Sequence, residues 1–171
     1  MCYRVIFLIL YSRICGKKVI LILSSLFVIL ILVVVAHNFT KSQSCVKAND
    51  QDIEALFDRW NDSLKTGDAY QVDANYTNDA VLLPTLSSDP RITSVQRVDY
   101  FKNFLTKYPT AKIDSHTITI GCNKAIDTGL YTFRPKGGKE LRARYTFTYR
   151  WDNNRWLISS HHSSLPPEDH S

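Results

Sequence analysis

The chain has 171 residues, enough for one domain of ordinary size with a short appendage. Its formal net charge is +5, but the excess lies before Cys45, where five basic residues stand and no Asp or Glu does. The rest of the chain carries 16 basic and 16 acidic residues and is therefore neutral overall. We expect no nucleic-acid partner, because such binding needs a basic face on the folded domain. The five early basic residues are Arg4, Arg13, Lys17, Lys18 and Lys41.

An uninterrupted apolar run of eighteen residues, 19–36, follows the first basic residues. At 1.5 Å per residue it spans roughly 27 Å, close to the hydrocarbon thickness of a bilayer. It is either an uncleaved transmembrane anchor or a signal segment that is cleaved near its small last residue. Because basic residues stay on the cytoplasmic side, residues 1–18 are expected in the cytoplasm and the C-terminal part outside, periplasmic or extracellular. Residues 37–49 are polar and are interpreted as a linker.

The four cysteines divide in the same way as the charges. Cys2 and Cys15 lie before the apolar run, whereas Cys45 and Cys122 lie in the part expected to be exported. Disulfides persist in exported compartments, so we predict a Cys45–Cys122 bridge. The alternative is a pair of buried thiols.

Three helices are predicted in the first half of the domain. Apolar residues at i, i+3, i+4, i+7 and i+11 form one face of a first helix, capped by Asn49 or Asp50 and ended near Gly67. Asp68 is expected to cap a shorter helix that runs to about residue 76. A short strand, 80–84, follows, and Ser94 is expected to cap a third helix that ends before Pro109. The apolar face of the first helix consists of Ile53, Leu56, Phe57, Trp60 and Leu64.

The second half of the domain is predicted to be all strand. Strands are expected at 112–122 and 125–134, followed by a hairpin over 139–164 that turns at 152–154. In the hairpin, apolar and polar residues alternate with the period of two that marks a strand with one buried face. Helices followed by an antiparallel meander predict an α+β fold, in which a curved antiparallel sheet wraps around the N-terminal helices as a cone. The domain is expected to occupy 50–168, with 169–171 as a tail.

The aromatic residues and one histidine suggest a site inside this cone. His161 and His162 are adjacent on a strand and point to opposite faces, so they do not share a metal ion. We expect no metal and no cofactor. His161 is the candidate catalytic residue, as a general base facing the cavity; the alternative is a structural, hydrogen-bonded histidine. The residues expected to line a pocket for a small apolar ligand, with ordinary core packing as the alternative, are Trp60, Tyr145, Phe147 and Tyr149.

The outer face of the last two strands suggests an interface. Simple alternation places Trp156 and Ile158 on this face, near Arg142 and Arg144. Two large apolar residues on a polar face are typical of a docking surface. We therefore expect a homo-oligomer, at least a dimer, that forms through the sheet.

Four segments carry a resemblance to a known family. ALFDRWNDSLKTGD (55–68), AVLLPT (80–85), the block 113–133 and the block 144–168 resemble bacterial proteins related to the association domain of calcium/calmodulin-dependent protein kinase II. That group lies in the nuclear-transport-factor-2-like (NTF2-like), or SnoaL-like, superfamily and includes SgcJ/EcaC-type proteins. The resemblance implies the cone fold and self-assembly.

The last strand departs from that family's pattern at two positions. The family strand reads His-x-His-Arg-Ser after a Trp, and Trp156, His162 and Ser164 match it. Ser160 replaces the first His, and Ser163 replaces an arginine that lines a basic pocket in the kinase domain. The resemblance therefore places Ser163 in the ligand pocket and removes the cation expected there.

Two functions are compatible with these observations. The first is an exported, membrane-tethered module that oligomerises and holds a small ligand. The second is a SnoaL-like or SgcJ/EcaC-type enzyme, an oxidoreductase or isomerase that acts on a small apolar substrate through a cavity histidine. The sequence offers no paired acid and base, which favours the first.

Overall fold

The computed structural model describes residues 44–85 and 87–167, together with Phe27, Ile29 and Ile31. The chain divides into two units, Met1–Ser44 and Cys45–Ser171, and the second is called the folded domain below. The predicted leader, the apolar run and most of the linker lie outside the described residues, apart from the three early apolar residues, which are helical and exposed. The predicted tail also lies outside them. Among the residues that are described, no helix is long and apolar enough to cross a bilayer.

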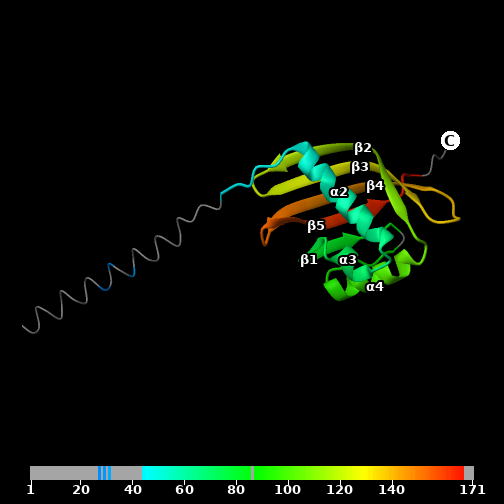
Figure 1. Ribbon diagram of the computed structural model, residues 1–171, viewed down its shortest axis with the longest axis horizontal. Coiled ribbons are helices and arrows are strands. Elements are labelled where there is room, and N and C mark those ends of the chain that lie inside the picture. Colours follow the sequence, from blue (N-terminus) through cyan, green and yellow to red (C-terminus); the bar gives the residue numbers. More distant parts are fainter. Residues whose placement is uncertain (1–26, 28, 30, 32–43, 86, 168–171) are drawn as a thin grey trace, which may run out of the picture. The chain divides into compact units, whose positions relative to one another are not determined.

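The described part of the folded domain combines helices with one five-stranded sheet, which confirms the α+β prediction (Figure 1). Figure 1 shows the first helix lying across the strands, and the other two near the edge formed by the first strand. In chain order the elements are α2 (Asp50–Lys65), α3 (Ala69–Asp73), β1 (Tyr76–Leu83), α4 (Ser94–Leu105), β2 (Thr110–Gly121), β3 (Lys124–Arg134), β4 (Leu141–Asp152) and β5 (Arg155–Ser164).

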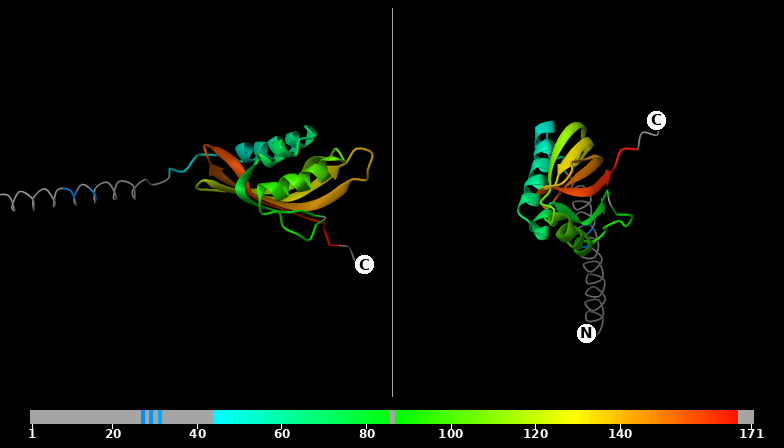
Figure 2. Two further views of the ribbon diagram at one scale, coloured as in Figure 1. Left: turned by 90° about the horizontal axis from the view of Figure 1, so that it is seen from below. Right: turned by 90° about the vertical axis from the view of Figure 1, so that its right-hand side faces the viewer.

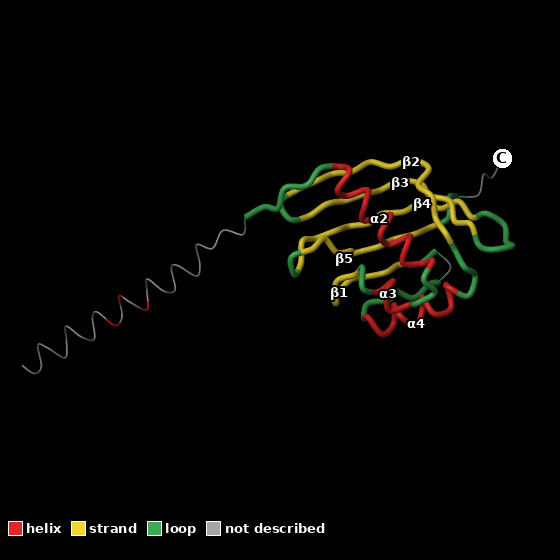
Figure 3. The backbone as a smooth tube through the Cα atoms, in the orientation of Figure 1, coloured by secondary structure: helices red, strands yellow, loops and turns green. Residues whose placement is uncertain are grey.

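The strand order in the sheet is β1-β5-β4-β3-β2. The last four strands form the predicted antiparallel meander, but β1 pairs with β5 in parallel. The expectation of a purely antiparallel sheet is wrong for this one pair. β1 comes from the helical half of the chain and lies at the edge of the sheet, where it runs in the same direction as β5. Figure 3 shows the loop between β3 and β4 projecting from one end of the sheet.

Helix ends follow local capping chemistry, with two corrections. Asn49 caps α2 through a capping box with Asp52, and Asp68 caps α3, both as expected. Residue Tyr76 begins β1 rather than ending α3, so the strand starts four residues before the predicted one. Thr93, not Ser94, caps α4, because the Gln96 side chain closes a capping box on it.

An irregularity in β2 accompanies the curvature of the sheet. The pairing of β2 with β3 shifts register between Ile113 and Ser115, which marks a bulge. Just beyond it β2 lies so close to β3 that a Cβ on Gly129 would collide with the carbonyl oxygen of Ser115 and stand 2.8 Å from the Cα of His116. Glycine is the residue that permits this approach. Figure 2 shows the helices on one side of the resulting curved sheet.

Helix α2 buries its predicted face against the sheet. Its five apolar stripe residues are all buried. Phe57 contacts the rings of Tyr145 and Phe147, with centroid distances of 6.3 and 6.1 Å. Burying one such large apolar side chain contributes roughly 1.5–3 kcal/mol, so this stripe is a main source of the domain's stability.

The prediction that Trp156 and Ile158 stand on the outer face is wrong. Both are buried in the core, with 7% and 1% of their surface exposed. The pairing of β4 with β5 shifts register at this point, so that Thr148 faces Ser160 but Tyr149 faces Ile158. The extra residue changes the phase of the alternation and turns the start of β5 inward.

The predicted disulfide is confirmed. Cys45 and Cys122 are bonded, with their Cα atoms 4.8 Å apart. The bridge joins the segment before α2 to the turn between β2 and β3, where the Asn123 side chain also accepts a hydrogen bond from the Val46 amide at 2.8 Å.

Candidate functional site

An apolar cavity of about 240 Å³ lies between α4, the inner face of the sheet and two surface turns. Aromatic side chains form a large part of its wall, and neutral polar groups form another part. Two lysines lie at its rim. The aromatic residues are Trp60, Tyr100, Phe101, Phe104, Tyr131 and Phe133.

A chain of hydrogen bonds runs through the polar part of the wall. The Trp60 indole N–H donates to the Tyr76 hydroxyl at 3.0 Å, and that hydroxyl lies 3.0 Å from Nδ1 of His161. On the other side of the ring, Nε2 of His161 lies 3.5 Å from the Tyr131 hydroxyl, a long contact. The Tyr131 hydroxyl donates to Ser163 Oγ at 2.5 Å. Ser163 in turn bonds to the hydroxyl of Thr85.

This chain accommodates a neutral His161. The Tyr76 oxygen accepts from Trp60, which can only donate, and Tyr76 still has its own proton for Nδ1 of His161. In that tautomer His161 carries its proton on Nε2, facing Tyr131. Its side chain is buried, and burial, followed by the neighbouring charge of His162, lowers the pKa of His161 to about 3. His161 is therefore a neutral imidazole at physiological pH.

Ser163 extends the hydrogen-bond chain to Thr85, at the edge of the cavity. Ser163 accepts from Tyr131 and is bonded to Thr85, and either of these two hydroxyls can be the donor in their bond. In both cases the other hydroxyl keeps its proton for a further acceptor. The wall thus offers a neutral hydroxyl donor to whatever fills the cavity.

Two turns form the rim. Lys107, in the turn after α4, and Lys139, in the loop between β3 and β4, both line the cavity and are exposed. The turns are joined, because the Lys136 amide donates to the Lys107 carbonyl at 3.0 Å and the Lys136 ammonium lies 5.5 Å from the ring centre of Tyr108. Tyr108 has a positive φ of 46°, a conformation that is unfavourable for an aromatic residue.

The predicted site residues separate into two groups. Trp60, His161 and Ser163 line the cavity. Tyr145, Phe147 and Tyr149 are buried but not among its lining residues. The rings of Tyr145 and Phe147 contact Phe57 of α2. These three residues therefore follow the core-packing alternative.

Sequence reasoning missed the half of the cavity that comes from α4 and the turns. Phe101 and Phe104 lie in the third predicted helix, and nothing in their spacing shows that they face an open space. Leu82 and Pro84 end a short strand, which gives no sign of a pocket wall.

A second polar cluster also escaped the sequence analysis. Asp127 is fully buried on β3, and its Oδ1 accepts from the Tyr145 hydroxyl at 3.0 Å and lies 3.3 Å from Nδ1 of His116. Nε2 of His116 lies 3.5 Å from a carboxylate oxygen of Glu54. Burial raises the pKa of the Asp127 carboxyl, although Tyr145 and His116 oppose this. The cluster contributes no residue to the cavity lining.

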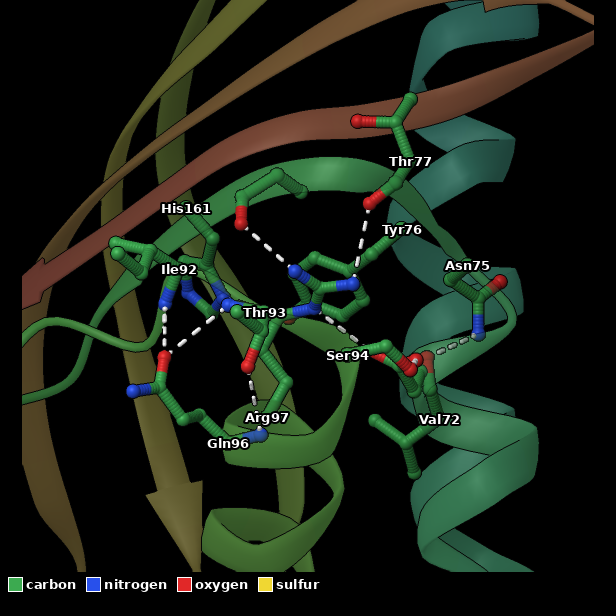
Figure 4. Close-up of polar contacts among 12 residues, drawn as sticks. Val72, Asn75, Tyr76, Thr77, Ile92, Thr93, Ser94, Gln96, Arg97 and His161 are labelled. Carbon is green, nitrogen blue, oxygen red and sulfur yellow. Dashed lines mark hydrogen bonds and ion pairs between the residues drawn. The ribbon is translucent and has the colours of Figure 1, made fainter.

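A buried cation supports the Tyr76 end of the hydrogen-bond chain (Figure 4). Arg97 of α4 is 1% exposed and donates to Asp73 Oδ1 at 2.6 Å, the Ala80 carbonyl at 2.7 Å and the Thr77 carbonyl at 3.1 Å. Its guanidinium carbon lies 5.5 Å from the ring centre of Tyr76. α4 is thereby fixed to α3 and β1.

The described residues form no set of metal ligands. Within the described ranges, no group of three or more His, Cys, Asp or Glu side chains is arranged to hold an ion. His161 and His162 lie on opposite faces, as predicted, since His161 is buried and His162 exposed.

Comparison with solved structures shows the fold and a relative. A protein from Xanthomonas campestris, assigned to the calcium/calmodulin dependent protein kinase II association domain, is 42% identical; the match covers 71% of this chain and 91% of that one, with a TM-score of 0.68. An NTF2-like protein of unknown function from Pseudomonas putida is 17% identical, covering 74% and 92%, with a TM-score of 0.64. An NTF2-like protein with a cystatin-like fold from Novosphingobium aromaticivorans is 14% identical, covering 71% and 82%, with a TM-score of 0.58.

Comparison with sequence families covers the same region. No curated protein matches the chain. The model of the calcium/calmodulin dependent protein kinase II association domain matches residues 49–167, nearly the whole folded domain. The predicted resemblance is confirmed, and the chain belongs to the calcium/calmodulin dependent protein kinase II association domain family, on an NTF2-like fold.

Proposed function

We propose that the folded domain is an exported, membrane-tethered module that assembles with copies of itself and holds one small ligand in its cavity. The observation that carries the ligand proposal is the apolar cavity with a hydrogen-bonding part in its wall. Membership of an association-domain family supports the assembly proposal. The apolar run before the domain supports the tether.

The cavity volume limits the ligand to about one ring. An apolar cavity of about 150 Å³ holds a benzene molecule, and the cavity here measures about 240 Å³. Drug-sized ligands occupy pockets of roughly 300 Å³ or more. A single ring with a short side arm therefore fits best.

The state of His161 supports binding over catalysis. A general base near neutral pH needs a pKa near 7, whereas burial lowers the pKa of His161 to about 3. Its Nδ1 is already hydrogen-bonded to the Tyr76 hydroxyl. An enzyme that uses His161 as its general base would need this ring to accept a proton from the bound substrate.

Calorimetric titration with phenylacetamide, a neutral one-ring probe, tests the ligand proposal. Cys45–Ser171 is a self-contained unit, and 91% of the crystallised Xanthomonas relative matches this region, so the domain is suitable by itself. We expect a dissociation constant of about 1 mM or below. Leu141→Trp should block the cavity, while Ile126→Trp on the outer face should not. Equal binding by both variants would place the ligand elsewhere.

The outer face of β3, β4 and β5 is the proposed assembly surface. A shallow hollow there is lined by Arg144, Thr146, His162 and Ser164 among others. The correction at Trp156 and Ile158 removes the apolar anchors that sequence alternation placed on this face, so polar contacts must supply more of the interface. Arg142 and Arg144 are both exposed.

Light scattering at tens of micromolar tests assembly. We expect the domain to be at least a dimer, and Arg144→Glu to dissociate it without loss of fold. Lys102→Glu on α4, an exposed charge reversal of the same size, should leave it intact. A monomeric wild-type domain would refute the assembly proposal.

Alkaline carbonate washing of membranes tests the tether. A full chain retained in the membrane fraction, with its C-terminus open to protease from outside, is the expected result. A soluble form that begins near residue 37 would show cleavage instead.

A further inference from the structure

Three lysines surround the mouth of the cavity, and two of them face it. Lys107 and Lys139 line the cavity, whereas Lys136, in the same loop as Lys139, lies over the Tyr108 ring and is not a lining residue. The carboxylate nearest in sequence, Glu140, is engaged by Arg134 at 2.6 Å. Among the described residues, neither Lys107 nor Lys139 has a carboxylate within 4 Å. The rim therefore carries two uncompensated positive charges.

The inner wall of the cavity carries no positive charge to match. Its polar groups are the hydroxyls of Thr85, Tyr131 and Ser163 and the neutral imidazole of His161, whose Nδ1 is hydrogen-bonded to Tyr76. The buried Arg97 is committed to Asp73 and two backbone carbonyls, and it is not a lining residue. An anionic group placed deep in this cavity would lose its hydration without gaining an ion pair, which is strongly unfavourable.

The position of the rim charges is fixed by contacts between the two turns. The Lys136 amide donates to the Lys107 carbonyl, and the Lys136 ammonium packs on Tyr108. These contacts hold the turn that carries Lys107 against the loop that carries Lys139. Two cations on a fixed mouth attract an anion to the mouth itself and raise its local concentration there.

We propose that the natural ligand is a small organic anion with one ring, bound with the ring inside the cavity and the anionic group at Lys107 and Lys139. This rests on the proposed ligand-binding function and names its ligand class. A hydrogen-bond acceptor on the far side of the ring would meet the free hydroxyl proton of the Thr85 and Ser163 pair. The ligand takes this orientation because the rim is positively charged and the lining of the inner wall is not.

Three probes of matched size test the proposal: phenylacetate, phenylacetamide and phenethylamine. They share a ring and a two-carbon arm and differ in charge. With the domain Cys45–Ser171 in calorimetry at low salt, we expect phenylacetate to bind about tenfold more tightly than phenylacetamide, and phenethylamine to bind more weakly than both. Salt at about 0.5 M should reduce the anion's advantage to about twofold, because exposed charge pairs are screened.

Lysine variants locate the effect. The double variant Lys107→Gln/Lys139→Gln should bind phenylacetate and phenylacetamide equally, with the amide affinity unchanged. Lys102→Gln, which removes an exposed charge on α4 that does not line the cavity, should keep the anion's advantage. All three lysines are exposed, so none of these variants should disturb the core.

The outcomes separate this proposal from the one on which it rests. If the amide binds and the anion binds no better, the anion proposal is wrong and the ligand-binding function stands. If phenethylamine binds best, the rim lysines do not select the ligand. If no probe binds in any variant, both proposals are overturned.

Discussion

Replacing Arg97 with Met should destabilise the folded domain strongly, although Met has similar length and an apolar stem. The guanidinium is 1% exposed and donates to one carboxylate and two carbonyls. After substitution, the Asp73 carboxylate, whose side chain is 12% exposed, retains the Ser94 hydroxyl but loses its cation. The carbonyls of Thr77 and Ala80 lose these donors.

The size of the effect follows from these contacts. Breaking a buried ion pair by removing one partner costs about 3–5 kcal/mol, because a buried charge is left uncompensated. A buried carbonyl left without a donor adds roughly 1–3 kcal/mol, and the better burial of the Met side chain offsets part of that sum. We therefore expect Arg97→Met to lower the free energy of unfolding by about 3–5 kcal/mol, measured by urea denaturation of Cys45–Ser171.

Two comparisons test this reasoning. Arg91→Met removes an arginine that is only half-buried, lying 5.9 Å from the Tyr100 ring centre and bonding to Ser87 at 3.0 Å, and should cost about 1 kcal/mol or less. Adding Asp73→Leu to Arg97→Met should recover part of the loss, since removing both partners leaves no isolated charge. A loss at Arg97 no larger than the loss at Arg91 would refute the argument that the buried pair and carbonyls matter.

Three further predictions concern the disulfide, the sheet bend and the buried histidine. Serine at both Cys45 and Cys122 should lower the free energy of unfolding by about 4–5 kcal/mol on the chain-entropy model, given a sequence separation of 77, and calorimetry of oxidised wild type against the variant measures this. Gly129→Ala should force β2 away from β3 and lower the melting temperature by several degrees, because the new Cβ meets the Ser115 backbone. An unchanged melting temperature would contradict the close approach of β2 to β3 at Gly129. His161 stays neutral in the fold down to about pH 3, while the unfolded chain protonates it near pH 6.5, so its contribution is fully present above pH 6.5 and is lost as pH falls toward 3. The unfolding free energy of wild type minus that of His161→Gln should therefore rise with pH between 3 and 6.5, by at most about 1.4 kcal/mol per unit, and be flat above it; a flat difference throughout would refute burial as neutral imidazole.

Local signals predicted the helices well. The apolar stripe of α2 and its Asn49 cap depend only on residues within a few positions of each other, and the structure confirms both. The disulfide was also predictable, because only two of the four cysteines lie after the apolar run and their sequence positions flank predicted elements. The cap of α4 was misplaced by one residue, because Thr93 and Ser94 are both good caps and only Gln96 decides between them.

Register was the part that sequence alone did not provide. Alternation in β4 is unbroken, so its inward residues were correctly identified. In β5 the register shift with β4 lies beside Ser159, a residue with no glycine or proline next to it to signal an irregularity. Simple alternation along β5 therefore put Trp156 and Ile158 on the wrong face. The cavity was equally hidden, since Lys107 and Lys139 come from turns more than thirty residues apart that meet only through tertiary packing.

The buried arginine and the cavity wall are parts of one structure. Arg97 lies against the Tyr76 ring and donates to the Asp73 carboxylate and the Thr77 carbonyl, which stand on either side of Tyr76 in sequence. Tyr76 in turn bonds to both Trp60 and His161, and the chain continues past His161 through Tyr131 to Ser163. Arg97 thus supports the Tyr76 end of the cavity wall without lining the cavity itself. The neutral polar groups of the wall and the lysines of the rim come from different parts of the fold, so the cavity has an uncharged interior and a charged mouth.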